Sequence, residues 1–145
     1  MHRAPASYPR INIGVIVAIV DGERLLLTKY AGRKYTHYAL VAGYTEVGET
    51  LEECCRREIA EEVGLSVKDL TYVTDQPWSF SDTLLVGFFA RLDGSDELTV
   101  DEGELSLAEW VERKDLPKTH EDTSSMTNWM IELFAKGEDP FSRKA

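Results

Sequence analysis

The chain has 145 residues, of which 43% are hydrophobic, and a formal net charge of −10 at pH 7. This length and composition predict one globular domain with a full hydrophobic core. They exclude a membrane-spanning helix, because the longest uncharged apolar run, Ile11 to Val20, is far too short for one. The lack of a Lys/Arg cluster argues against a broad nucleic-acid-binding surface.

The turn signals and the apolar periodicities predict eight elements. In chain order they are strands over Ile11–Val20, Leu25–Leu27 and Tyr38–Val41, a helix from Leu51 to Val63, strands over Leu70–Thr74, Thr83–Leu92 and Ala108–Glu112, and a helix capped by Ser124 or Ser125 and ended by Gly137. The first strand is rich in β-branched residues and should be buried on both faces. Residues 1–7 are expected to be a flexible arm, residues 75–82 a turn-rich loop, and residues 93–104 an acidic loop with a possible extended piece at Leu98–Val100.

The two cysteines and the N-terminus favour the cytoplasm. Cys54 and Cys55 are adjacent in the expected helix and cannot form a framework of disulfides, which is typical of a reducing compartment. The residues that follow Met1 contain no apolar stretch of signal-peptide type.

The helix over 51–63 carries its own start and stop signals. Thr50 and Glu53 have the spacing of a capping box, and Gly64 can adopt the left-handed conformation that ends a helix. An apolar stripe then recurs every fourth residue, at Leu51, Cys55, Ile59 and Val63. This stripe should face the core.

Three carboxylates share one face of this helix. Glu58, Glu61 and Glu62 have i, i+3, i+4 spacing, and Glu58 and Glu62 should project at the edges of the buried stripe. Carboxylates crowded at the margin of a core repel one another unless a cation lies among them, and such hard oxygen donors suit Mg²⁺ or Mn²⁺. The alternative is an acidic surface helix with ordinary Glu–Arg pairs.

The spacing of the whole segment favours the metal site. Gly43 is followed after five residues by Glu49, after seven more by Arg57-Glu58-Ile59, and then by Glu61-Glu62 and Gly64-Leu65. This pattern resembles the box of the Nudix hydrolases position for position. The resemblance implies an α/β fold, the Nudix-type α/β/α sandwich with a mixed β-sheet, as a single domain over residues 8–137 with a C-terminal tail over 138–145. It also implies metal-dependent cleavage of diphosphates.

A second motif points to the substrate. Gln76 beside the rigid Pro77-Trp78 element offers one hydrogen-bonding edge and one flat apolar wall, a pair that can hold a heterocyclic base. The alternative is that Trp78 and Phe80 are loop anchors that plug the core. The segment from Asp75 to Thr83 resembles the S-Q-P-W-P-F-P-x-S array of NADH pyrophosphatases, with Gln, Pro, Trp and Phe in register.

The resemblance assigns roles to individual residues. It implies metal ligation by Glu58 and Glu62, with Glu61 as a ligand or base, the Ala42 carbonyl as a further oxygen donor, and Glu104 as an additional glutamate with Glu102 as its competitor. The box residues with a structural role would be Gly43, Glu49, Arg57 and Gly64, with Arg57 paired to Glu49 rather than to phosphate. The base pocket would comprise Tyr44, Gln76, Trp78 and Thr83, lined by Ile16 and Leu85 and completed by Tyr8, from the same chain or a partner.

The sequence thus predicts metal-dependent hydrolysis of a dinucleotide such as NADH or NAD⁺ into two mononucleotides. ADP-ribose, a nucleoside triphosphate or a nucleotide-capped RNA 5′ end remain alternative substrates, and a non-catalytic nucleotide-sensing regulator remains an alternative function. The expected cofactor is Mg²⁺ or Mn²⁺; no zinc is expected, because the chain has no CxxC pair. No membrane partner is expected, and the sequence leaves open whether the chain forms a homodimer.

Overall fold

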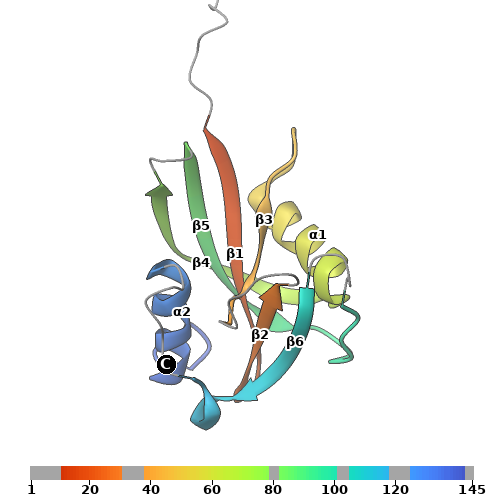
Figure 1. The fold of residues 1–145 in the computed structure, drawn as a ribbon, viewed down its shortest axis with the longest axis vertical. Helices are drawn as coiled ribbons and strands as arrows, with labels where there is room; N and C mark the ends of the chain where they lie inside the picture. Colours follow the sequence, from red (N-terminus) through yellow and green to blue (C-terminus); the bar gives the residue numbers. More distant parts are fainter. Residues whose placement is uncertain (1–10, 31–37, 79–81, 101–104, 118–124, 143–145) are drawn as a thin grey trace, which may run out of the picture.

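The computed structural model describes residues 11–30, 38–78, 82–100, 105–117 and 125–142 (Figure 1). The elements are β1 (Asn12–Asp21), β2 (Arg24–Tyr30), β3 (Val41–Tyr44), α1 (Leu51–Val63), β4 (Val67–Trp78), β5 (Thr83–Leu92), β6 (Leu105–Glu112), the 3-10 helix η2 (Arg113–Asp115) and α2 (Ser125–Ala135). Neither described helix is long and apolar enough to cross a membrane.

The strands form one mixed sheet in the order β4-β5-β1-β2-β6, and β3 pairs with β1. The β1–β5 pair is parallel, whereas the other pairs are antiparallel. On the side away from β5, β1 pairs with β3 over Gly14–Val17 and with β2 at its last two residues, Val20 and Asp21. Among the described strands, β3 pairs with β1 alone.

Alternate residues of β1 build two cores. Val15, Val17 and Ile19 pack on one face with the apolar stripe of α1. Ile16, Ala18 and Val20 pack on the other face with α2, through Met126, Met130 and Phe134. Side chains of a strand alternate between the two faces of a sheet, so one uninterrupted apolar strand serves both layers. The predicted α/β/α sandwich is confirmed, with α1 and α2 covering opposite faces.

Several predicted strand boundaries were wrong, and two of them affect the site. The third strand begins at Val41 rather than Tyr38, and before it only Ala39 makes an isolated bridge, to Thr28. The first part of the expected loop over 75–82 is strand instead, because β4 runs to Trp78, which pairs with Thr83 of β5. Pro77 is tolerated there because β4 is an outer strand of the sheet.

The structure also refines the predicted surroundings of the helix ends, at the end of α1 and at both ends of α2. Leu98–Val100 is not a strand; instead the Thr99 amide donates to the Val63 carbonyl and satisfies the end of α1. The last helix begins at Ser125, so a cap at position 124 lies outside the described residues. After α2, Gly137 adopts a positive φ, and residues 138–142 pack back on the domain, with Asp139 fully buried.

Candidate active site

The helix that carries the carboxylates is fixed at both ends. The Thr50 hydroxyl accepts from the Glu53 amide, and the Glu53 carboxylate accepts from the Thr50 amide. At the other end, Gly64 has φ 71° and donates its amide to the carbonyls of Ile59 and Ala60. These local signals fix where α1 begins and ends. Its apolar stripe, which packs in the core with β1, determines which side faces the sheet.

Glu58 lies directly against the backbone of β3. A Cβ atom added at Gly43 would overlap the carboxyl group of Glu58, so no larger residue fits at position 43 while Glu58 keeps its place. The Glu58 side chain is 15% exposed. The predicted structural role of the box glycine thus has a physical basis: it creates the space that one of the three glutamates occupies.

Arg57 connects the helix to the segment before it. Its Nε and Nη2 donate to the two carboxylate oxygens of Glu49, at 2.7 and 2.9 Å. Its Nη1 donates to Glu58 at 2.9 Å and to Glu61 at 3.3 Å, and its Nη2 also donates to the Tyr44 carbonyl at 2.9 Å. The predicted pairing of Arg57 with Glu49 is therefore present, in the bidentate form that holds a carboxylate most firmly.

This pairing dominates the electrostatics of the site. Hydrogen bonding to Arg57 lowers the pKa of Glu49 to about 2, with help from the Glu46 amide. The same hydrogen bond raises the pKa of Arg57, since the ion pair favours the charged guanidinium. The neighbouring thiols are inert by contrast, because burial raises the pKa of Cys54 to about 11 and that of Cys55 to about 12.

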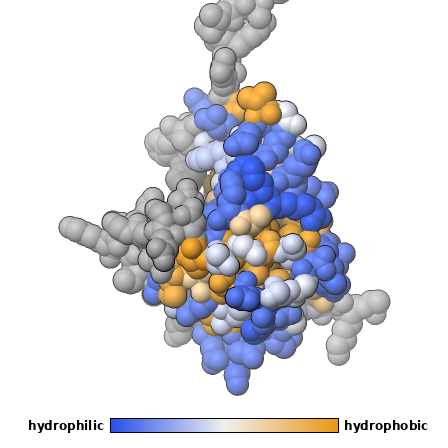
Figure 2. All heavy atoms as spheres, turned by 90° about the vertical axis from the view of Figure 1, so that its right-hand side faces the viewer, coloured by the Kyte–Doolittle hydropathy of each residue, from blue (hydrophilic) through white to orange (hydrophobic). Residues whose placement is uncertain are grey.

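The three glutamates occupy different surroundings. Glu62 is 1% exposed, whereas the side chain of Glu61 is 53% exposed and that of Glu58 lies between them. The side of the molecule that carries α1 is largely hydrophilic, with a band of hydrophobic residues across it (Figure 2). A buried Glu62 is costly unless its charge is compensated, which distinguishes it from the solvated carboxylates of an ordinary acidic helix.

The carboxylate oxygens are of the type that a hard divalent cation prefers, but the described side chains do not converge on one point. Within the described residues, no three acidic, histidine or cysteine side chains are placed to hold a metal ion. Glu104 and its competitor Glu102 lie outside the described residues. What supports the metal is the donor chemistry: two glutamates withdrawn from solvent, one of them in the space that Gly43 leaves.

The register of β3 orients the Ala42 carbonyl. Thr45 donates its amide to the Ile13 carbonyl, so the pairs that bond across β1 and β3 are Ile13–Thr45 and, two residues on, Val15–Gly43. Tyr44 lies between these two pairs and Ala42 follows the second one, so the carbonyls of both point away from β1. The Tyr44 carbonyl meets Arg57 on that side, and the Ala42 carbonyl faces the same edge.

The predicted base pocket corresponds to one face of the sheet. Tyr44, Gly14, Leu85 and Gln76 are successive Cα partners across β3, β1, β5 and β4, and we call this set the base row. Residues opposite one another in a sheet project to the same face. Leu85 packs against the core beneath α2, so the base row lies on the α2 face. Glu58 lies on the opposite face, with α1.

The members of the predicted pocket differ in exposure. Tyr44 is 58% exposed and Gln76 is also exposed, whereas Leu85 is half-buried and Thr83 is buried. Ile16 is 5% exposed and belongs to the core beneath α2, so its part in a pocket stays a prediction. The backbone of Trp78 pairs with Thr83 at the end of the β4–β5 hairpin. Tyr8 lies outside the described residues.

Gly14 was not among the predicted site residues. A Cβ at this position would lie 3.1 Å from a methyl carbon of Leu85 and 3.4 Å from a ring carbon of Tyr44. Gly14 thus lets these two side chains approach each other across β1. A glycine inside an otherwise β-branched strand signals such a close approach, and this signal was available in the sequence.

A mixed sheet with an acidic helix on one face and a second helix on the other defines the class of α/β/α sandwich domains. Within this class, the chain belongs to the Nudix family, because the family model described as NUDIX domain matches residues 9–131. The predicted membership of the Nudix family is confirmed.

Curated relatives carry a more specific description. The chain is 43% identical over 116 residues to the "NAD-capped RNA hydrolase NudC" of Escherichia coli O1:K1 / APEC, which covers 80% of this chain and 45% of that protein. It is 39% identical over 112 residues to the protein of the same description from Photobacterium profundum, covering 77% and 42%. The chain thus spans less than half the length of these relatives.

Solved structures agree on the fold. A hydrolase of the NUDIX family from Clostridium perfringens superimposes with a TM-score of 0.71 at 22% identity, covering 88% of this chain and 98% of that one. At this identity the likeness concerns the fold alone.

Proposed function

We propose that this domain hydrolyses the diphosphate bond of a nucleotide derivative, with a dinucleotide such as NADH or NAD⁺ as substrate and two mononucleotides as products. The observation that carries this proposal is the position of β3. Its Gly43 faces Glu58 and α1, whereas its Tyr44 belongs to the base row on the other face. A substrate that lies across the edge of β3 would place its diphosphate by the glutamates and its base on the row.

The residues that would hold a metal are Glu58 and Glu62, with Glu61, the Ala42 carbonyl and Glu104 as further candidates. When bound, Mg²⁺ or Mn²⁺ would polarise the phosphoryl oxygens and lower the pKa of the attacking water. Nudix hydrolases generally use divalent metal ions, and the acidic box supports that dependence here. The cation would also reduce the electrostatic repulsion between a polyanionic substrate and a protein whose net charge is −10.

The side chains of the box would divide the remaining work. Arg57 positions Glu58 from one side while Gly43 bounds it from the other, so the carboxylate keeps one orientation. Glu61 is the most exposed of the three glutamates, and its contacts to Arg57, at 3.3 and 3.4 Å, are longer than the 2.9 Å contact of Glu58. It is therefore the best placed to accept a proton from water, and ligation of the metal is its alternative role.

The base row would recognise one end of the substrate. Tyr44 offers an exposed ring and Gln76 an exposed amide, with Leu85 and Gly14 as the surface between them. Such a surface combines stacking with hydrogen bonding, which suits a nucleobase. The printed name of the curated relatives, which specifies an NAD cap, supports the choice of a nicotinamide dinucleotide.

The test is a hydrolysis screen with Mg²⁺ or Mn²⁺ over NADH, NAD⁺, ADP-ribose and nucleoside triphosphates. The highest kcat/KM is expected for a dinucleotide. Trp78→Ala and Gln76→Ala should each lower it, Trp78→Ala by about tenfold or more, since a lost stacking wall removes buried area as well as ring contacts. Tyr72→Ala is the matched control, because Tyr72 is an exposed aromatic of the same strand that packs on Phe88 instead.

Melting temperatures of the same samples separate recognition from packing. If Trp78→Ala lowers stability strongly and leaves the relative rates on NADH and ADP-ribose unchanged, Trp78 is a core plug and the dinucleotide assignment fails. If no nucleotide derivative is hydrolysed while one binds, the domain is a nucleotide-sensing regulator.

The 5′ end of an NAD-capped RNA is a second candidate substrate, and the printed description of the relatives favours it. The acidic balance opposes extensive contact with the RNA chain, so recognition would be confined to the cap. A capped oligonucleotide should then be cut with little dependence on RNA length. We place the reaction in the cytoplasm, where buried free thiols such as Cys54 and Cys55 persist. Light scattering would establish whether the chain is a homodimer.

A further inference from the structure

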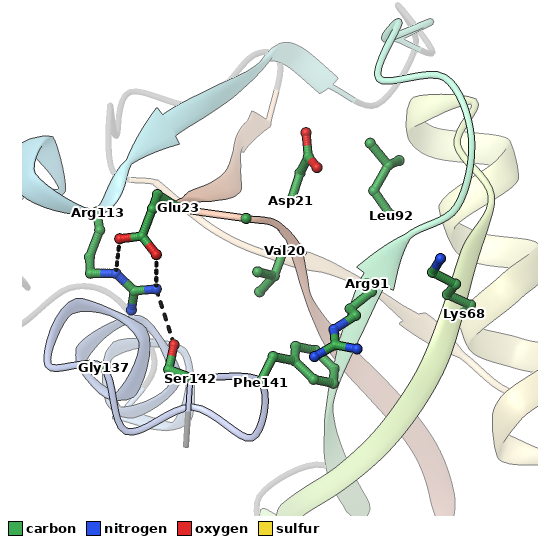
Figure 3. A pocket seen from close by; sticks show the side chains of 11 residues that line it. Val20, Asp21, Glu23, Lys68, Arg91, Leu92, Arg113, Gly137, Phe141 and Ser142 are labelled. Atoms are coloured by element: carbon green, nitrogen blue, oxygen red, sulfur yellow. Dashed lines mark hydrogen bonds and ion pairs between the residues drawn. The ribbon is translucent and has the colours of Figure 1, made fainter. Parts of the chain in front are cut away.

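A hollow of about 540 Å³ lies at the other end of the sheet from the candidate active site. Its wall includes the row formed by Val20, Arg91 and Lys68, which are Cα partners across β1, β5 and β4. This row lies on the same face as the base row, six residues further along β1, or about 20 Å at about 3.3 Å per residue. We call this hollow, with all the residues that line it, the cationic hollow (Figure 3).

The charges around the cationic hollow do not balance. Arg24, outside the hollow, pairs with Asp21 and Asp96. Arg113 pairs with Glu23 and with the buried Asp139. Arg91 contacts Asp69 at 3.4 Å, with both side chains about half exposed, and lies over the Phe141 ring at 4.5 Å. Among the described residues, Lys68 makes no ion pair. The side chains that line the hollow thus carry three positive charges, on Lys68, Arg91 and Arg113, and two negative charges, on Asp21 and Glu23, in a protein whose net charge is −10.

The geometry places two like charges side by side. Lys68 and Arg91 are directly opposite one another in the antiparallel β4–β5 pair, an arrangement that destabilises a sheet. An irregularity follows at once in β4, where Asp69 takes a positive φ of 55° and the register shifts. Bulges of this kind redirect side chains and are often found beside binding sites. An anion between Lys68 and Arg91 would turn the repulsion into two attractions.

We propose that the cationic hollow binds a phosphate group, either inorganic phosphate or the phosphate of a small metabolite such as a mononucleotide. Lys68 and Arg91 supply the charge, and the Ser142 hydroxyl, which already accepts from Arg113, keeps its proton to donate. The volume falls within the range of small-molecule sites. Because the C-terminal segment carries Phe141 and Ser142, the ligand would also join that segment to β4 and β5.

The test is a titration of the ¹⁵N-labelled, metal-free protein with sodium phosphate and with AMP at constant ionic strength, followed by amide chemical shifts. Saturable shifts are expected at Lys68, Arg91 and Phe141, with a dissociation constant in the millimolar range. The double variant Lys68→Gln/Arg91→Gln should weaken binding by about tenfold or more, because both charge-assisted contacts are lost. The control Lys114→Gln/Lys136→Gln changes the net charge equally at exposed lysines that do not line the hollow, and it should bind within about twofold of the wild type.

Three outcomes would overturn the proposal: no saturable shift at the hollow, equal weakening in both double variants, or shifts confined to α1 and β3. The two ligands identify the source of the phosphate group. If phosphate and AMP bind with equal affinity, the hollow recognises the anion alone. If AMP binds more tightly, the apolar wall near Phe141 also contributes to its binding. The result does not depend on hydrolysis, so it stands apart from the proposed function.

Discussion

Arg57 and Arg113 each gather several acceptors, and their surroundings differ in charge balance. Arg57 holds Glu49 and contacts Glu58 and Glu61, while a further carboxylate, that of Glu62, is buried in the same helix. Arg113 donates to Glu23, the Asp139 carboxylate, the Phe134 carbonyl and the Ser142 hydroxyl. One arginine thus stands among a surplus of carboxylates on a single helix. The other connects the turn between β1 and β2 with the end of α2 and the segment after it.

The contrast separates two uses of the same side chain. At Arg113 the guanidinium compensates the buried Asp139 and holds together segments far apart in sequence, so its role is in stability. Arg57 pairs with Glu49, Glu58 and Glu61, and its single positive charge cannot neutralise these three carboxylates. The remaining negative charge suits a cation from solution. Variants at the two clusters should therefore change different measured quantities.

The largest effect is expected from Glu62→Gln. The substitution keeps the shape of a buried side chain and removes its charge, so turnover should fall at least about 100-fold while the protein stays folded. Hydrolysis of NADH at saturating Mg²⁺ or Mn²⁺ measures it, with Glu52→Gln, an exposed glutamate of the first turn of α1, as the matched control. Activity of the Glu62 variant within about threefold of the wild type would remove Glu62 from the metal site.

Arg113→Met should lower stability. It keeps most of the apolar stem and leaves the fully buried Asp139 uncompensated, so the free energy of unfolding should fall by about 2–3 kcal/mol. Urea denaturation measures this loss. Adding Asp139→Asn should recover at least about 1 kcal/mol, since the neutral amide needs no cation. An Arg113 variant as stable as the wild type would mean that the exposed Glu23 is its only effective partner.

The sequence predicted α1 to the residue because its signals are local. Thr50, Glu53 and Gly64 lie at or within a few residues of its ends, and the structure has the capping box and the left-handed glycine that they predict. The buried depth of Glu62 was only partly foreseen, since periodicity placed it at the edge of the apolar stripe and the packing of α1 on the sheet buries it. The position of a residue on a helix predicts the side on which its side chain projects, whereas the depth of its burial depends on the layer that packs against the helix.

Features built from distant segments were not predictable in the same way. Arg113 meets Glu23 and Asp139, 90 and 26 residues away, and nothing in the local pattern indicates either contact. The extension of β4 to Trp78 was hidden by Asp75 and Pro77, which are typical of turns, because the outer position of β4 becomes known only with the strand order. The base row likewise needs the register of four strands.

Gly43→Ala tests how tightly the carboxylates of the box are placed. The added methyl group would overlap the Glu58 carboxyl, so Glu58 must move and turnover should fall by about tenfold. Gly48→Ala is not a matched control because of its positive φ, and Ala60→Ser, at an exposed position of α1, serves instead. Steady-state kinetics and the melting temperature are measured together. If Gly43→Ala keeps full activity, the position of Glu58 beside β3 is not the active one.

The smallest effect concerns the acid stability of the Arg57 cluster. The pKa of Glu49 is lowered from 4.5 to about 2, so this carboxylate favours the folded state wherever it is charged there and would be charged in the unfolded chain. Its contribution is complete above pH 4.5 and is lost as the pH falls towards 2. The melting temperature of Glu49→Gln should therefore lie below that of the wild type by a constant amount near neutral pH, and the gap should close between pH 4.5 and 2.

Glu46→Gln is the control, because Glu46 is 71% exposed and its carboxylate lies 3.7 Å from Arg57. A gap that persists at the acid end would show that the Glu49 side chain stabilises the protein by its shape and hydrogen bonds, and that the charge of the ion pair contributes nothing measurable.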